Sequence, residues 1–321
     1  MFTASVGGCV RLRLSPCDRY HPQMQTQRIR VADGVELAVD TWQAARDKRT
    51  RPTAAKGPGL PAFVLIHGLA SNARLWNGVA AGLVAHGHSV ATVDLRGHGR
   101  SSKPDGPYGV ATVADDVATL IAGLGLDRPV VVGQSWGGNV VIELAARHPK
   151  VTRGIVCVDG AWLEPSRVFP DWETCREELA PPRLAGRPLA EIEGYIRSAH
   201  PDWPETGIQG TLANFEVRPD GTIAPWLTYE RHLAVLRGLW DHHPSTRYAD
   251  VAVPVLLVPV DGGEADRTKW AERKRRDVDA ALAAMPNARV RWFAGDHDIH
   301  AQRPDELAAM LHDLTVDGFF G

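Results

Sequence analysis

The chain has 321 residues, of which 44% are hydrophobic and 23% charged, and its formal net charge is −2. These proportions are typical of a soluble globular enzyme, and the small charge gives no electrostatic reason to bind nucleic acid or an anionic membrane. No apolar run is long enough to span a membrane, and the four cysteines lack the spacing of a metal site. We therefore expect a cytoplasmic monomer or homodimer that binds a small molecule and requires no metal or organic cofactor.

The first recognisable element begins just after Met24. Residues 1–24 carry arginines but no apolar run long enough for a signal peptide, so we expect them to be disordered or a misassigned leader. Two alternating segments, 27–31 and 35–39, flank an Asp-Gly turn and predict a β-hairpin. The polar stretch 44–59, rich in proline and glycine, predicts a surface loop.

Apolar strand-like runs then alternate with helical patterns. The strand-like runs cover residues 61–66, 89–94, 130–132, 154–159 and 253–258. Helical spacing of apolar residues marks segments near 76–86, 113–124 and 140–145. Strands that are apolar throughout, separated by amphipathic helices, predict an α/β fold with a mainly parallel sheet covered on both faces.

Residues 161–249 interrupt this alternation. They are rich in proline and tryptophan, with tryptophans at positions 162, 172, 203, 226 and 240. We expect most of these rings to pack within the segment. Some should face a substrate pocket, where they favour an apolar or aromatic group.

The most informative motif is Gly-Gln-Ser-Trp-Gly at residues 133–137, between a run of valines and a helical pattern. Gly-x-Ser-x-Gly in this position is typical of a nucleophile elbow, a strained turn that lifts the serine hydroxyl above the sheet. Glycines flank the serine because a Cβ there would collide with the neighbouring strand or helix. The turn also sets Ser135 at a helix N-terminus, where partial positive charge favours a developing anion.

Three further turns follow predicted strands: His67-Gly68, residues 94–101, and residues 295–300 near the C-terminus. Together with the elbow, they resemble the α/β-hydrolase superfamily in order and spacing. The match covers roughly residues 25–160 and 250–315.

The resemblance implies an eight-stranded, mainly parallel sheet with helices on both faces. Residues 25–160 and 250–321 would form this core. Residues 161–249 would form a helical cap, inserted after the sixth strand and covering the active site.

The resemblance also assigns catalytic roles. Ser135 would be the nucleophile, and its attack on a carbonyl would give a covalent acyl-enzyme. Relatives that open epoxides or displace halide carry aspartate at this position, so serine indicates acyl chemistry. The backbone amides of Trp136 and Leu69 would form the oxyanion hole, whereas His67 is expected to be structural.

Two histidines near the C-terminus compete for the role of general base. His297 and His300 both precede the Pro304 that begins the last predicted helix. The family pattern places the catalytic histidine first. We therefore expect His297 to be the base and His300 to be structural or to line the pocket.

The triad acid departs from the family pattern, which places an aspartate just past the seventh strand in a Gly-x-x-Asp context. Asp261 lies closest to the end of that strand, while Asp266 fits the letters but comes about three residues late. Asp159, at the end of the sixth strand, is a further candidate because some family members use that position. We rank Asp261 first, Asp159 second and Asp266 third; the acid must reach Nδ1 of His297.

These assignments predict a serine hydrolase, of the carboxylic ester hydrolase type, for a small or medium, apolar ester, lactone or thioester. The alternative is a carbon–carbon bond hydrolase of a dienoate, which relatives perform with the same triad. That reaction needs a site for the substrate carboxylate, and Arg96 and the arginines of residues 161–249 leave room for one. A non-catalytic small-molecule receptor on the same scaffold is a third hypothesis.

Overall fold

The computed structural model describes residues 24–43, 60–262 and 269–321. The expected leader before Met24 and the loop predicted for residues 44–59 lie outside this part of the chain, as does Asp266. Within the described ranges, no helix is both long and apolar enough to cross a membrane.

The described residues form a central sheet of eight strands in the order β1-β2-β4-β3-β5-β6-β9-β11. These strands are β1 (Met24–Ala32), β2 (Val35–Trp42), β3 (Phe63–Ile66), β4 (Val90–Val93), β5 (Val130–Gln134), β6 (Gly154–Val158), β9 (Val255–Val258) and β11 (Ala288–Val290). The β1–β2 and β2–β4 pairs are antiparallel and the other pairs are parallel. The prediction of an α/β fold with a mainly parallel sheet is therefore confirmed.

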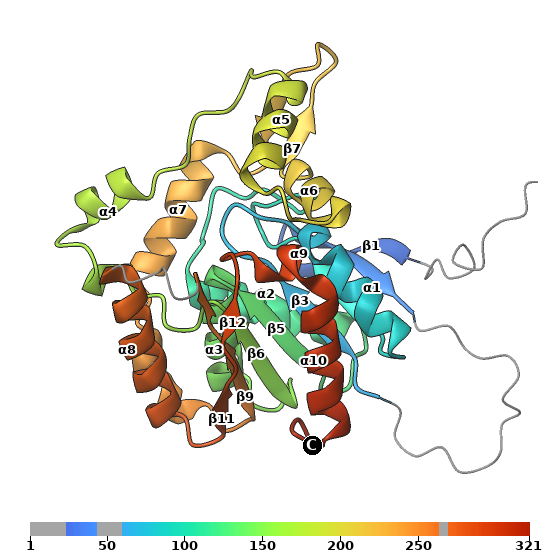
Figure 1. Cartoon of the computed structure of the whole chain (residues 1–321), viewed down its shortest axis with the longest axis vertical. Coiled ribbons are helices and arrows are strands. Elements are labelled where there is room, and N and C mark those ends of the chain that lie inside the picture. Colours follow the sequence, from blue (N-terminus) through green and yellow to red (C-terminus); the bar gives the residue numbers. More distant parts are fainter. Residues whose placement is uncertain (1–23, 44–59, 263–268) are drawn as a thin grey trace, which may run out of the picture.

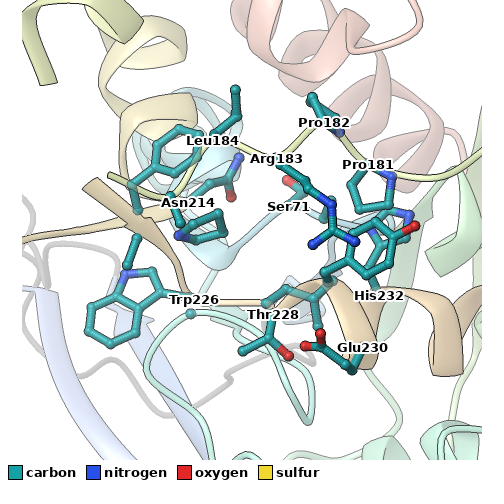
Figure 2. Close-up of a pocket in the computed structure, with 18 of the residues that line it drawn as sticks. Ser71, Pro181, Pro182, Arg183, Leu184, Asn214, Trp226, Thr228, Glu230 and His232 are labelled. Atoms are coloured by element: carbon teal, nitrogen blue, oxygen red, sulfur yellow. The ribbon is translucent and has the colours of Figure 1, made fainter. Parts of the chain in front are cut away.

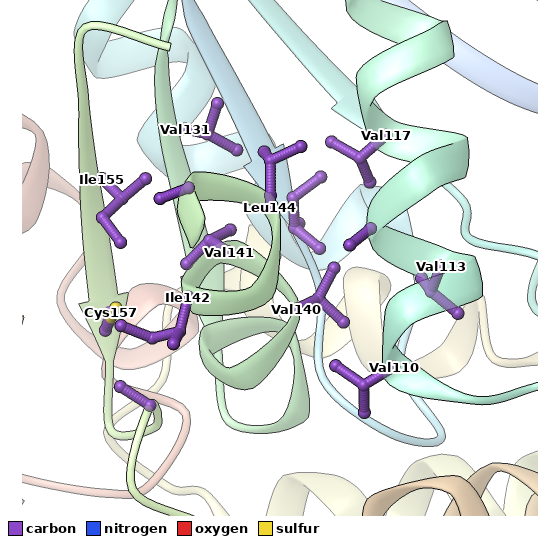
Figure 3. Packing of buried hydrophobic residues seen from close by; sticks show 14 of the residues in the cluster. Val110, Val113, Val117, Val131, Val140, Val141, Ile142, Leu144, Ile155 and Cys157 are labelled. Carbon is purple, nitrogen blue, oxygen red and sulfur yellow. The ribbon is translucent and has the colours of Figure 1, made fainter. Parts of the chain in front are cut away.

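Helices cover both faces of the sheet (Figure 1). One face packs against α2 (Val110–Gly123), α3 (Trp136–Arg147) and α8 (Lys269–Ala284), and the other against α1 (Asn77–Ala85) and α10 (Pro304–Val316). Figure 3 shows valines of α2, among them Val113 and Val117, beside the apolar side chains of α3. Because full burial of one such side chain is worth roughly 1.5–3 kcal/mol, this packing holds the start of α3 firmly against the sheet.

The segment of residues 161–249, here called the inserted segment, runs between β6 and β9. It contains α4 (Trp172–Glu178), α5 (Leu189–Ala199), α6 (Glu205–Leu212), α7 (Tyr229–Trp240) and a hairpin of β7 (Phe215–Val217) and β8 (Ile223–Pro225). Figure 1 shows these elements together at one end of the molecule. The segment is mainly helical and also contains this hairpin, which was not predicted.

Close backbone contact joins the inserted segment to the rest of the molecule. A Cβ on Gly210 in α6 would lie 2.7 Å from Cα of Leu75, in the 3-10 turn Ala73–Trp76. Ile208 and Trp203 are buried in the same small apolar cluster as Leu75. The inserted segment is therefore anchored on the chain just after β3.

Several short elements complete the fold. They are the 3-10 turns Pro165–Arg167, Pro244–Thr246 and Tyr248–Asp250, the helix α9 (Ile299–Gln302), and the paired strands β10 (Val260–Asp261) and β12 (Phe293–Ala294). Proline explains two boundaries, since Pro254 precedes β9 and Pro259 separates β9 from β10, and proline cannot donate a backbone hydrogen bond. The β10–β12 pair brings the loop that carries His297 beside the sheet edge.

Candidate active site

Ser135 occupies a sharp turn between β5 and α3, with φ 54° and ψ −122°. A Cβ on Gly133 would lie 2.1 Å from the carbonyl oxygen of Gly137, and one on Gly137 would lie 2.6 Å from the carbonyl oxygen of His67. Only glycine fits either position. The turn therefore has the geometry expected of a nucleophile elbow, with a non-glycine residue held at positive φ.

The chain that leaves β6 passes directly beside this turn. The amide of Ser135 donates to the carbonyl of Val158 over 2.8 Å. A Cβ on Gly160 would lie 2.1 Å from the carbonyl oxygen of Ser135. Asp159, between Val158 and Gly160, is thereby brought next to the elbow.

His297 forms a hydrogen bond with Asp159, and Nδ1 lies 2.6 Å from Oδ2. The Asp159 side chain is only 2% exposed, whereas that of His297 is 52% exposed. Burial acts to raise the pKa of Asp159, but the hydrogen bonds and charges of His297 and Lys274 outweigh it and lower the pKa. For His297, desolvation acts to lower the pKa, and the bond to Asp159 raises it above its ordinary value.

Lys274 of α8 contacts the same carboxylate. Its Nζ lies 2.9 Å from Oδ2 of Asp159 and also donates to the carbonyl of Val260 over 2.8 Å. The amide of Val260 donates to the other carboxylate oxygen over 3.1 Å. No sequence motif singled out Lys274, because its contact with Asp159 spans 115 positions in the chain.

The other two candidate acids are placed differently. Asp261, ranked first from the sequence, lies in β10, and its Oδ2 is 3.5 Å from Nη2 of Arg275. Asp266 is outside the described residues. Of the candidates that can be compared, Asp159 is the one hydrogen-bonded to His297.

His300 is fully buried against the ring of Trp76, with ring centroids 4.3 Å apart. Burial, with the nearby charges of His297 and His67, lowers its pKa to about 3. Within the described structure, neither ring nitrogen has a hydrogen-bond partner. His300 therefore lies in the core as a neutral side chain.

The two expected oxyanion-hole amides border the elbow. Trp136 is the first residue of α3, where no carbonyl of the helix can accept its N–H. Leu69 follows Gly68, and a Cβ on Gly68 would lie 3.0 Å from Cβ of Ser135. His67 braces this loop, because its ring bonds the carbonyl of Gly68 and the amide of Leu95.

Gln134 is a polar residue of the site that sequence reasoning missed. Its Nε2 donates to the carbonyl of His297 over 3.3 Å, and its Oε1 would collide with a Cβ on Gly68. It thus bridges the loop of His297 and the loop of Leu69. The signal in the sequence that could have identified it was a glutamine at the end of an otherwise apolar strand.

Two cavities lie where the inserted segment meets the rest of the molecule. The smaller, of about 330 Å³, is lined by Ser135, Glu164 and His232 and otherwise by apolar side chains. Those apolar side chains include Leu69, Leu163, Val168, Phe169, Leu236 and Leu239. We call it the Ser135 cavity.

The larger cavity, of about 470 Å³, lies farther into the inserted segment (Figure 2). Its walls come from residues 181–185, residues 224–230 and the loop residues Ala70 and Ser71. We call it the Arg183 cavity. Of the five tryptophans of the inserted segment, Trp226 lines it.

Neither metal binding nor a carboxylate site at Arg96 finds support among the described residues. They contain no group of three or more His, Cys, Asp or Glu side chains that could hold a metal ion. Arg96 is buried, and it donates to Asp116 over 2.6 Å and to the carbonyl of Pro107 over 2.9 Å. It is therefore engaged within the fold.

Comparison with known proteins agrees with this architecture. Residues 61–215 match the family model described as the alpha/beta hydrolase fold. A protein of Mesorhizobium japonicum, named 2-(acetamidomethylene)succinate hydrolase, is 28% identical over 257 residues, which cover 78% of this chain and 86% of the relative.

Solved structures show the same fold. The structure of E-2-(acetamidomethylene)succinate hydrolase has a TM-score of 0.71 at 22% identity and covers 92% of this chain and 100% of its own. A thioesterase domain from the curacin biosynthetic pathway has a TM-score of 0.68 at 22% identity, covering 92% and 99%. This chain is therefore an α/β hydrolase, a member of the α/β-hydrolase superfamily.

Proposed function

We propose that the protein is a serine hydrolase that cleaves a small or medium ester, lactone or thioester through an acyl-enzyme. Ser135 attacks the carbonyl, and His297 accepts the serine proton and later donates it to the leaving group. The observation that carries this proposal is the 2.6 Å hydrogen bond between Nδ1 of His297 and Asp159. Asp159 belongs to the stretch of chain after β6 that passes beside the strained turn at Ser135.

Asp159 is the proposed acid of the triad. A buried carboxylate that accepts a hydrogen bond from Nδ1 of His297 leaves Nε2 as the basic nitrogen. It also stabilises the imidazolium that forms when His297 takes the serine proton. The lowered pKa of Asp159 supports this role, because it keeps the carboxylate ionised. The amides of Leu69 and Trp136 are the proposed donors to the oxyanion.

The Ser135 cavity favours an apolar acyl group, since most of its walls are leucine, valine and phenylalanine side chains. The inserted segment acts as a cap over it, because α7 contributes Leu236 and Leu239 to those walls. The Mesorhizobium relative, named as a hydrolase, supports hydrolytic chemistry at this site.

Labelling with a fluorophosphonate probe tests the proposal. The wild-type protein should be labelled at Ser135, as mapped by peptide mass spectrometry, and Ser135→Ala should lose both labelling and ester turnover while its thermal unfolding is unchanged. Ser198→Ala, on the exposed surface of α5, is the matched control and should be labelled like the wild type. A folded wild-type protein that neither labels nor cleaves p-nitrophenyl esters of any chain length would contradict the proposal.

A further inference from the structure

We propose that the Arg183 cavity binds a carboxylate at the far end of the substrate's acyl group. The proposal rests on the serine-hydrolase function proposed above and narrows its substrate class. The substrate would be an ester or thioester of a dicarboxylic acid, with one carboxyl group esterified and the other free.

The two cavities meet. His232 of α7 lines both of them. The loop after β3 also borders both, because Leu69 lines the Ser135 cavity and the next two residues, Ala70 and Ser71, line the Arg183 cavity. An acyl chain whose carbonyl oxygen is bound at the amide of Leu69 can therefore continue past this loop into the larger cavity.

The cavities lie on the acyl side of the reacting bond. His297 must lie next to the leaving group, because it donates the proton that the leaving group takes away. His297 lines neither cavity. The group that occupies them is therefore the one that stays bonded to Ser135.

Arg183 is poised to bind an anion. Figure 2 shows its guanidinium projecting into the middle of the cavity, and its Cζ lies 4.1 Å from the centroid of the Tyr229 ring. Among the residues that the structure describes, no carboxylate forms an ion pair with Arg183. Stacking on Tyr229 leaves the N–H edge of the guanidinium available for a bidentate bond to a carboxylate.

A second polar group faces the same space. Ser71 lines the cavity, and its hydroxyl oxygen is buried without a hydrogen-bond partner in the described part of the chain. Burying a hydroxyl without a hydrogen-bond partner costs free energy, and a ligand that forms a hydrogen bond with it offsets this cost. Ser71 is therefore suited to donate a hydrogen bond to the ligand.

The charges around the cavity favour a single negative charge. Three charged side chains line the cavity, those of Arg183, Arg218 and Glu230, and together they carry one net positive charge. His232 also lines the cavity, and burial lowers its pKa to about 4, so that its ring is neutral at pH 7. Much of the remaining wall is apolar, with Leu184, Trp226, Leu227 and three prolines. Such walls suit the methylene chain between the two carboxyl groups.

Matched ester pairs test the proposal. The substrates are the mono-p-nitrophenyl esters of straight-chain dicarboxylic acids, from about four to about ten carbons, each beside the same ester with its free carboxyl methylated. At the best chain length, kcat/KM for the free acid should exceed that of its methylated partner about tenfold, the size of one charge-assisted hydrogen-bonded contact. Arg183→Gln should abolish this preference, and Glu230→Gln should increase it.

Arg187→Gln is the matched control. Arg187, like Arg183, lies in the chain between α4 and α5. Its side chain is exposed, forms an ion pair with Glu191 of α5 and does not line the cavity. The preference for the free acid should be unchanged in this variant. An equal loss in Arg187→Gln and Arg183→Gln would overturn the assignment to Arg183.

Binding of the unesterified dicarboxylic acids to Ser135→Ala, measured by calorimetry, provides a readout that does not depend on turnover. Arg183→Gln in the same background should weaken it. If neutral esters are cleaved but the free acids are neither preferred nor bound, the carboxylate proposal is wrong and the serine-hydrolase proposal stands. If no ester is cleaved and Ser135 is not labelled, the proposed function fails, while the binding measurement still decides whether the Arg183 cavity takes a carboxylate.

Discussion

Replacing Lys274 with methionine probes the network around the proposed triad acid. Nζ of Lys274 and Nδ1 of His297 both contact Oδ2 of Asp159, at 2.9 and 2.6 Å, so the two nitrogens are at most about 5.5 Å apart. The lysine charge disfavours the imidazolium form and acts to lower the pKa of His297. Its removal should therefore raise that pKa.

The distance between the two side chains sets how far the charge of Lys274 lowers the pKa of His297. Two unit charges about 5.5 Å apart interact by about 3 kcal/mol at an effective dielectric constant of about 20, and by about 0.8 kcal/mol in water. The side chains of His297 and Lys274 are 52% and 30% exposed, so solvent screening brings the interaction to about 1 kcal/mol. Because the base must be neutral, kcat/KM should fall about fivefold on the acidic limb and little on the plateau.

The assay is kcat/KM for a p-nitrophenyl ester between about pH 5 and about pH 9 at constant ionic strength. In Lys274→Met, the acidic limb should move to higher pH. Arg275→Met is the matched control, because it removes the same charge from the next position of α8, where the side chain contacts Asp261 instead. A limb that stays in place, or moves to lower pH, would refute this reasoning about Lys274.

Two further predictions follow from the same contacts. Asp159→Asn should lower kcat/KM by about 10³–10⁴, because the imidazole loses its orienting carboxylate, whereas Asp261→Asn should change it by less than about threefold; equal losses would contradict the assignment. Burial lowers the pKa of His300 to about 3 and that of His67 to about 4, against 6.5 without burial, so the folded state binds fewer protons than the unfolded state below pH 6.5. The free energy of unfolding should therefore fall as the pH drops from 6.5 toward 4, and His300→Phe should reduce this slope in urea titrations; an unchanged slope would argue against a neutral His300.

Much of the fold could be predicted from the sequence because its signals are local. The apolar runs predicted strands at the right places, although β3, β4, β6 and β9 are shorter than predicted and β5 is longer. The hairpin of β7 and β8 was missed, since each strand has three residues, too few for an alternating pattern to be recognised.

The sequence signal of the elbow is local as well. Gly133 is required by a contact within the strand-turn-helix unit, with the carbonyl of Gly137, whereas Gly137 is required by its contact with His67 after β3. The five-residue motif, read together with the valine run before it and the helical pattern after it, predicted the turn and identified Ser135 as the candidate nucleophile.

The partner of His297 was decided by tertiary structure. Asp159 and Asp261 both follow strand ends, and because β6 and β9 are parallel neighbours, both reach the same edge of the sheet. Their separation from His297 in the sequence does not reveal which way each carboxylate points. Asp159 turns at φ 43° toward the amide of Val260 and toward His297, whereas Asp261 is paired with Ala294 in a short strand.

The Arg183 cavity could not be predicted from the sequence either. Its walls combine residues near positions 70, 183 and 228, which no periodic pattern connects. The sequence by itself determined the strand-helix alternation and the position of the serine turn, because both leave a pattern in consecutive residues of the chain. Only the tertiary structure decided which carboxylate reaches His297 and where an acyl chain can extend, because both depend on side chains that folding brings together from distant positions.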